Sequence, residues 1–448
     1  MNIVRSVIIV VLMLGVLATL HELGHYLVAR LLKIKVFEVS IFVGPKLLRW
    51  KHKGVDFSIR LIPVGAYVRF TEVDEQGYVV ESKDPDLLIN QPRIKRLLVS
   101  LAGPFVNLLL GTVVFAMLFW FNGYSSVNVD KTIRGTQLYN VSSEYNEGDE
   151  VRAINGRRVY TAFDLDFEID SADQGAPMTV TFRSKETHKN YDVTLTPEFK
   201  RRPMLLITAE TLSTDNDYKG WLVHSVEPEQ NKGNPVLKVG DYVTHVNGKA
   251  VADEDFQEYL FTVTDEVLQV TYIRDDVEYE AEIIPEYVDY VTTRGIYLKA
   301  HKITSAGEFF EAFGYAAKMP AALFNITVTG IKSIIAGREK AYNLVSGPIG
   351  ITTMVNDVVK DERDTVSEKL YTLVMLTGVI SIALAYSNLL PIPGLDGIQI
   401  VLILVEMVIG RKLSEKAEGK LTVVGFVLII LLVIFALVSD VLRIIFGY

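Results

Sequence analysis

The sequence contains no cysteine among its 448 residues, so disulfides, thiol nucleophiles and thiolate metal ligands are all excluded. It also lacks a basic excess. There are 45 Lys and Arg against 54 Asp and Glu, and a net charge of −9 argues against a nucleic-acid-binding protein. Histidine is scarce, at seven residues. Any metal centre must therefore be built from these few histidines and from carboxylates.

Hydrophobic residues, by contrast, make up 49% of the chain, while 22% of the residues are charged. This mixture excludes a disordered chain and indicates a membrane protein with sizeable polar domains. A helix needs about 20 residues to cross a bilayer. Four apolar stretches predict transmembrane helices, whereas 398–410 contains Glu406 and is too short to count. The four stretches are 3–20, 97–121, 370–390 and 421–439.

The loops between these stretches predict an orientation. Residues 33–96 carry 12 Lys or Arg against 8 Asp or Glu, whereas residues 122–367 carry 25 against 39. Basic loops stay inside, so the long acidic region and both termini are expected outside. A signal peptide at the N-terminus fits less well, because no small-residue cleavage site precedes a polar segment.

The long exterior region contains an internal repeat. Residues 148–159 recur as 240–251, and each copy reads Gly-Asp, a short alternating strand, an Asn-Gly turn and a second strand. A helical stretch follows at 163–170 and 253–260, and then a strand at 178–182 and 267–273. The pattern resembles PDZ domains. Such domains add a peptide to a sheet edge, and a spacer or steric filter that binds no peptide is the open alternative.

The sharpest motif lies in the first apolar stretch, His21-Glu22-Leu23-Gly24-His25. On a helix, residues four apart share one face, so the two imidazoles can bind one zinc ion. Zinc lowers the pKa of a bound water to about 7, and the adjacent carboxylate can take its proton. The alternative is that the two histidines and the glutamate only hydrogen-bond to one another. Ionisable groups within a membrane are costly, however, and are usually functional.

Zinc needs a third protein ligand, and Asp396 is the best candidate. It is the only charged residue between 370 and 405, and it follows a segment broken by Pro391 and Pro393. Irregular backbone at membrane depth persists only inside protein or beside a cavity. An Asp-Gly turn at the inner surface is the alternative reading. Beside an intramembrane HExxH motif, the zinc ligand is favoured.

Together these motifs resemble the site-2 protease family of zinc intramembrane metalloproteases, in particular the bacterial regulator-of-sigma-E type with tandem PDZ domains. The resemblance implies that His21, His25 and Asp396 bind one zinc ion and that Glu22 is the general base. It further implies that the substrate contacts Asn388, Pro391, Pro393 and a β element around Gly65 and Tyr67. Other matching segments are 44–47, 61–68, 102–107 and 346–350.

The predicted fold is a multi-span α-helical membrane protein with four transmembrane helices, membrane-associated β-strands after the first, and two inserted PDZ-like α+β domains. The predicted segments are the first transmembrane helix (1–35), a cytoplasmic-side loop with the β element (36–93), the second transmembrane helix (94–122), the two PDZ-like domains (123–204 and 205–300), an amphipathic helical segment and linker (301–367), the third transmembrane helix with its loop (368–397), and an inner loop with the fourth helix (398–448).

The predicted function is cleavage of single-span membrane proteins, such as anti-sigma factors or remnant signal peptides, after a first protease has trimmed them. The resemblance implies a bacterial inner membrane, with the PDZ-like domains outside and the active site toward the cytoplasm. A proteolytically silent membrane scaffold would have no need of Glu22. A membrane protease of the prenyl-protein type would take its third ligand from a glutamate and would lack the PDZ pair.

Overall fold

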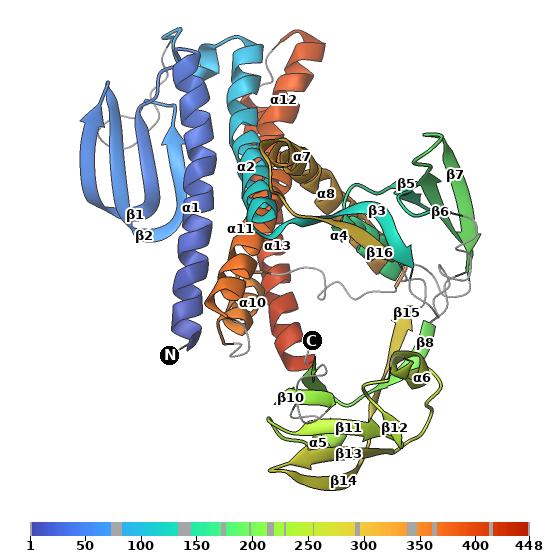
Figure 1. The fold of residues 1–448 in the computed structure, drawn as a ribbon. Helices are drawn as coiled ribbons and strands as arrows, with labels where there is room; N and C mark the ends of the chain where they lie inside the picture. Colours follow the sequence, from blue (N-terminus) through green and yellow to red (C-terminus); the bar gives the residue numbers. More distant parts are fainter. Residues whose placement is uncertain are drawn as a thin grey trace. The chain divides into compact units, whose positions relative to one another are not determined.

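The computed structural model describes residues 2–72, 83–132, 145–171, 176–196, 199–212, 219–227, 230–253, 255–291, 296–337, 347–360, 365–411 and 415–446. The chain forms two compact units, one of Met1–Tyr124 with Ala300–Tyr448 and one of Ser125–Lys299 (Figure 1). The second unit coincides closely with the region 123–300 that the repeat predicts. Apolar helices dominate the first unit, and β-sheets dominate the second.

Three helices among the described residues are long and apolar enough to cross a membrane: α1 (Asn2–Leu31), α2 (Arg93–Asn122) and α11 (Val366–Leu389). These are the first three predicted spans. The fourth falls on α13 (Glu415–Phe446), whose described residues supply only a shorter apolar helix, Ile430–Val441. Four transmembrane helices therefore remain a prediction.

Helix α2 is the centre of this unit, because α1, α11 and α12 (Asp396–Ile409) all pack against it. Small residues make the close approaches possible. A side chain at Gly24 of α1 would meet the Ala102 carbonyl of α2 at 2.7 Å, and one at Gly378 of α11 would press on Phe115. The sequence predicts an inner loop after residue 397. The structure instead has helix α12 at the start of that segment.

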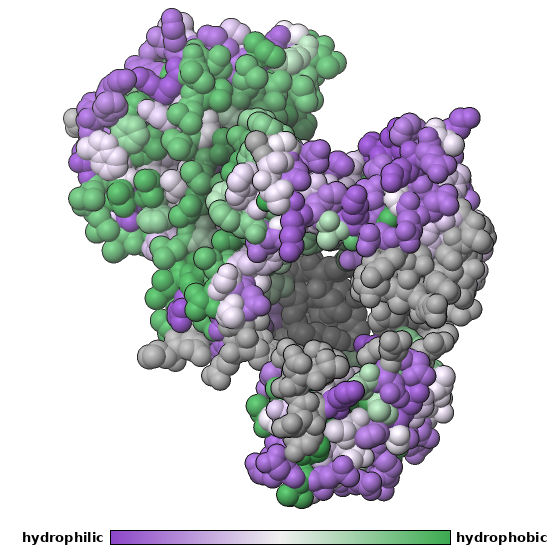
Figure 2. Space-filling model, in the orientation of Figure 1, coloured by the Kyte–Doolittle hydropathy of each residue, from purple (hydrophilic) through white to green (hydrophobic). Residues whose placement is uncertain are grey.

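The outer surface of α1 is apolar along its length. Val4, Ile8, Leu12 and Val16 recur every four residues and are all more than 40% exposed. Figure 2 shows hydrophobic residues gathered over the helices of the first unit and hydrophilic residues over the second. A continuous apolar stripe on a long helix is suited to contact with lipid chains.

The segment predicted to be amphipathic forms α7 (Ala306–Ala316) and α8 (Met319–Ile335). Ala312, Tyr315 and Met319 are buried against Phe115 and Phe119 of α2. The apolar face of α7 and of the start of α8 therefore packs on the helical core.

A buried carboxylate ties α13 to α10 (Pro348–Lys360). The backbone amides of Gly347 and Ile349 donate to Asp440 at 2.9 and 3.1 Å. Asp440 thus satisfies amides that the start of α10 leaves without helical partners. Ser346, the first residue of this predicted motif, lies outside the described residues.

The β element after α1 is a long hairpin of β1 (Glu38–His52) and β2 (Val55–Arg69). Both strands bend, so that residues 38–41 pair with 56–59 on one side and with 66–69 on the other. Among the described residues, 66–69 pairs on one side only and forms a sheet edge.

The second unit contains two sheets of matching strand order. One runs β16-β3-β4-β6-β7 with β5 beside β4, and the other runs β9-β10-β11-β13-β14 with β12 beside β11. In the first sheet the strands are β3 (Tyr124–Thr132), β4 (Glu150–Ile154), β5 (Arg157–Arg158), β6 (Met178–Arg183), β7 (Asn190–Leu195) and β16 (Ile296–His301). In the second they are β9 (Ile207–Leu212), β10 (Gly220–Val226), β11 (Tyr242–Val246), β12 (Lys249–Ala250), β13 (Leu268–Arg274) and β14 (Val277–Ile283).

The two sheets differ in how the chain enters them. Strand β16 falls within the predicted second domain, 205–300, but pairs with β3 of the first sheet. A separate ladder of β8 (Phe199–Met204) and β15 (Glu286–Val291) flanks the second sheet in sequence. The second domain is thus inserted into the first. Each sheet also carries the predicted helix, α4 (Ala162–Asp170) or α6 (Phe256–Leu260).

The repeated Gly-Asp pair has a structural role. Asp149 is buried and accepts hydrogen bonds from two backbone amides and from the Tyr191 hydroxyl. Asp241 is equally buried and accepts from the guanidinium of Arg274 at 2.7 Å. A buried carboxylate is tolerated only when it is paired in this way, so each aspartate fixes the turn before its strand.

The repeated Asn-Gly pair forms the predicted turns. Asn155 and Asn247 take φ values of 49° and 50°, and the glycine after each has φ 75°, as a type I′ turn requires. Each asparagine also bonds the neighbouring strand twice: the side-chain oxygens accept from the amides of Thr179 and Gln269 at 2.8 Å, and the asparagine amides donate back to their carbonyls. The repeated Asn-Gly pair therefore forms the turn in each sheet and links it to the neighbouring strand.

A buried ion pair joins α2 to α12 and generates a prediction. Arg96 Nη1 lies 2.7 Å from Glu406 Oε2, and the Glu406 side chain is 1% exposed. Glu406→Leu leaves the arginine charge buried and unpaired, so we expect it to lower the free energy of unfolding by about 3–5 kcal/mol.

The double variant Arg96→Leu/Glu406→Leu should recover most of that loss, because no buried charge remains. Removal of the exposed pair Arg49–Asp56 is the control and should cost at most about 1 kcal/mol. Denaturation of the detergent-solubilised chain measures the free energy of unfolding of the single, double and control variants. A Glu406→Leu effect no larger than the control would contradict the prediction.

Candidate metal centre

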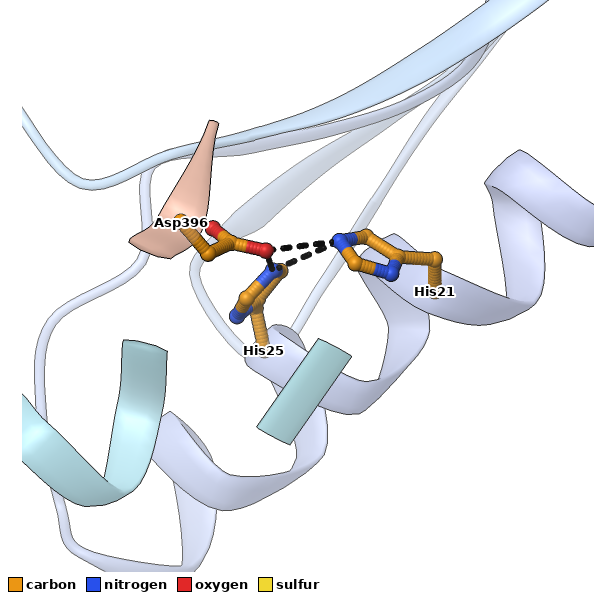
Figure 3. Close-up of side chains that lie close together, drawn as sticks. All are labelled: His21, His25 and Asp396. Carbon is orange, nitrogen blue, oxygen red and sulfur yellow. Dashed lines mark hydrogen bonds and ion pairs between the residues drawn. The ribbon is translucent and has the colours of Figure 1, made fainter. Parts of the chain in front are cut away.

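Three predicted ligands meet at one point. His21 and His25 lie one turn apart on the same face of α1, and both are buried. Asp396 is the first residue of α12, and its side chain points at both rings (Figure 3). Asp396 Oδ2 lies 2.9 Å from His21 Nε2 and 3.4 Å from His25 Nε2, and the two Nε2 atoms are 3.2 Å apart.

This donor set fits zinc. In a tetrahedral zinc site with metal–ligand bonds of about 2.0–2.1 Å, neighbouring ligand atoms lie about 3.3 Å apart. The three distances in this site cluster around that value. Two imidazoles and one carboxylate leave a fourth position for water or substrate, as catalytic zinc sites do. Among the described residues this is the one group of side chains with metal-ligand geometry.

Helix α2 holds the histidines from behind. Val99, Gly103 and Asn107 recur every four residues and so share one face. The Val99 carbonyl accepts from His25 Nδ1 at 2.7 Å, and the Asn107 amide lies 3.2 Å from His21 Nδ1. A Cβ at Gly103 would lie closer than 3.0 Å to Nε2 of both histidines, so only glycine leaves them room.

The third ligand depends on the loop between α11 and α12. Residue 394 is a glycine with φ 102°, a backbone conformation that side chains disfavour. A Cβ at Gly397 would clash with the carbonyls of Leu389 and Leu390, which shows how tightly the loop folds over the start of α12. The Asp-Gly pair therefore has two roles. Gly397 permits the tight turn, and Asp396 supplies the candidate third ligand. Asp396 also begins α12, where an acidic residue is favourable.

Glu22 faces a cavity beside the metal ligands. Its Oε2 accepts a hydrogen bond from the Val68 amide of β2 at 3.0 Å. The cavity has a volume of about 200 Å³, and Glu22 lines it with His21 and Asp396. The carboxylate is thus held between the candidate metal ligands and the sheet edge at 66–69.

The predicted substrate residues divide into two groups. Asn388 and Gly65 line the cavity. The side chain of Tyr67 instead accepts a hydrogen bond from Arg60 at 2.6 Å, and neither Pro391 nor Pro393 lines the cavity. The direct contribution of the loop to the lining comes from residues 394–396.

Sequence reasoning assigned no role to Gly103 and Asn107, although the segment 102–107 was among the matching motifs. Gly103 admits the two imidazoles, and Asn107 contacts one of them. The available signal was the polar Asn107 within a 25-residue uncharged stretch. A buried amide in a membrane helix requires a hydrogen-bond partner, which marks it as a position to examine.

The second unit contains a larger cavity of about 300 Å³ along the β9 edge of its second sheet. Trp221, Leu260 and Leu268 supply an apolar lining, and Ala209 of β9 lies at its wall. A sheet edge that has no further strand partner among the described residues, beside a cavity with apolar side chains in its wall, is suited to an extended peptide.

Comparison with known proteins places these features in context. The sequence profile of Peptidase family M50 matches residues 9–432. The regulator of sigma-W protease RasP of Bacillus subtilis is 24% identical over 456 residues, which cover 98% of this chain and 99% of the relative. The zinc metalloprotease RasP of Bacillus licheniformis is 23% identical over 459 residues, with 98% and 99% coverage.

The close approach at Gly103 generates a prediction. Gly103→Ala places a methyl group against both Nε2 atoms, so we expect the purified chain to lose most of its bound zinc. Gly314→Ala is the matched control, because a Cβ at this helical glycine meets nothing within 4 Å. Zinc content after exhaustive dialysis measures both. Equal zinc occupancy in the two variants would show that α2 does not confine the site.

Proposed function

Because the chain belongs to peptidase family M50, the site-2 protease family, and is a zinc metalloprotease, we propose that it is an intramembrane endopeptidase with His21, His25 and Asp396 as zinc ligands. The observation that carries this proposal is the convergence of the three donor atoms within 3.4 Å of one another on two helices of the apolar first unit. No other grouping among the described residues offers zinc such a set.

In this proposal Glu22 is the general base. Zinc bound at the site would polarise the scissile carbonyl and acidify a water molecule. Glu22 takes the proton from the attacking water and delivers it to the amine that leaves. The hydrogen bond from the Val68 amide fixes one carboxylate oxygen of Glu22, which lines the cavity.

The substrate segment is proposed to bind as an extended strand. A peptide bond within a helix is shielded, and an unwound segment in a membrane needs partners for its freed amides and carbonyls. Apart from the Val68 amide, which bonds Glu22, the edge at 66–69 offers such partners, and Asn388 offers an amide at the cavity wall. Gly65 then contributes to the cavity wall, and Tyr67 supports the edge through its pairing with Ser40 of β1. Pro391 and Pro393 shape the loop near the site.

The proposed substrates are single-span membrane proteins of the anti-sigma-factor or remnant-signal-peptide type in a bacterial inner membrane. The name of the Bacillus subtilis relative, a regulator of sigma-W protease, supports the first class. The charge bias of the loops supports an exterior placement of residues 122–367 and an active site toward the cytoplasm.

The two exterior domains are proposed to be PDZ-like and to exclude substrates that still carry bulky ectodomains. The matching strand orders and the paired Asn-Gly turns support the PDZ-like assignment. The cavity along β9 offers a site for a peptide, which makes capture of a newly cut terminus the competing role for the second domain.

The catalytic assignment predicts separable effects of two substitutions. Glu22→Gln should retain zinc but lower cleavage of a tagged single-span substrate by about 10²–10⁴-fold, because the base is lost. Asp396→Asn should lose zinc as well as activity, since a carboxylate ligand is removed. Cellular cleavage assays and the zinc content of the purified chains measure both. Undiminished cleavage by Glu22→Gln would refute its role as base.

The exterior domains can be tested by deletion. Removal of Ser125–Lys299 should allow cleavage of substrates with intact ectodomains, which the full chain is expected to leave uncut. Ala209→Arg is the companion variant, because it fills the β9 cavity and keeps both domains. It should cleave trimmed substrates normally and still reject untrimmed ones. Persistent rejection by the deletion would refute the filter, and loss of trimmed-substrate cleavage by Ala209→Arg would favour peptide capture.

A further inference from the structure

The outer nitrogens of the two histidines have unequal partners. His25 Nδ1 lies 2.7 Å from the carbonyl of Val99, which can only accept a hydrogen bond. His21 Nδ1 lies 3.2 Å from the side-chain amide nitrogen of Asn107. Asn107 is 1% exposed, and its Oδ1 has no hydrogen-bond partner among the described residues.

Metal binding decides which partner His21 needs. A histidine that binds through Nε2 carries its proton on Nδ1, so Nδ1 becomes a donor. An amide NH₂ is also a donor and cannot pair with it. A half-turn of the Asn107 amide exchanges its nitrogen and oxygen. It then brings the unpartnered Oδ1 to Nδ1–H, so that these two atoms become acceptor and donor to one another.

We propose that Asn107 is a positioning residue of the metal site, whose Oδ1 accepts the Nδ1–H of His21 and sets the orientation of that ring. The proposal rests on the zinc-ligand assignment above. Val99 and Asn107, two turns apart on α2, then hold the two imidazoles in the same way, one through a backbone carbonyl and the other through a side-chain carbonyl. Gly103 lies between them and leaves room for the rings.

The same geometry separates two asparagines at the cavity. Asn388 Nδ2 also approaches His21 Nδ1, at 3.5 Å, but Nδ1 has one proton to donate. Asn107 is nearer and more buried, and it is its backbone carbonyl, not its side chain, that accepts from Ser381 of α11 at 2.8 Å. Asn107 therefore holds the ring, which leaves the Asn388 amide available to a substrate in the cavity.

The test measures zinc affinity of the full-length, detergent-purified chain by competition with a chromophoric chelator. Asn107→Leu removes the acceptor, so the zinc Kd should rise about 10–100-fold, as for other outer-shell partners. Asn107→Asp keeps an acceptor in the same place, so its Kd should match or fall below that of the wild type. An aspartate variant as weak as the leucine variant would overturn the proposal, because it would show that the residue donates.

Ser381→Ala is the matched control. It removes the adjacent interhelical hydrogen bond and leaves the Asn107 side chain intact, so zinc Kd should not change. If Ser381→Ala weakens zinc as much as Asn107→Leu does, the role of Asn107 is packing alone, and the proposal fails. Thermal unfolding of each variant separates this from loss of fold.

His21→Ala tests the underlying ligand assignment. If that variant binds zinc as tightly as the wild type, the zinc-ligand assignment fails. If His21→Ala loses zinc while Asn107→Leu does not, the ligand assignment stands and the positioning role is refuted.

Discussion

The close crossing of α1 and α2 is the constraint on which the site depends. Gly24 lets α1 approach the backbone of α2, and Gly103 lets the histidine rings occupy space that any side chain would fill. Only at this separation can a carbonyl and an amide of α2 reach the outer nitrogens of His25 and His21. Three ionisable groups are then tolerated in an apolar unit, because each has a partner.

From the other side, α12 brings Asp396 to the same point and is itself fixed by the pair of Glu406 with Arg96. The candidate metal site is therefore assembled from segments that are far apart in sequence and that all contact α2. The β hairpin completes the arrangement, because the Val68 amide reaches Glu22. The proposed base and the proposed substrate-binding residues Gly65 and Asn388 thus line the same cavity.

Much of this organisation was predictable from sequence, and the reason differs from residue to residue. The His21–His25 spacing and the isolated charge of Asp396 are local signals that need no tertiary knowledge. The Asn-Gly turns likewise follow from backbone preference and are confirmed by φ values of 49° and 50° at Asn155 and Asn247. The position of Asn107 against His21 depends on how two helices cross, which no local pattern encodes.

The path of β16 has a consequence for how the chain is made. Strand β3 lies near residue 124, but its edge partner β16 ends at His301, after the whole second sheet. The second sheet, in contrast, uses strands that are near one another in sequence, and near contacts close at lower entropic cost. As synthesis proceeds from the N-terminus, the later domain is complete before the earlier one can close. The first domain is begun first and finished last.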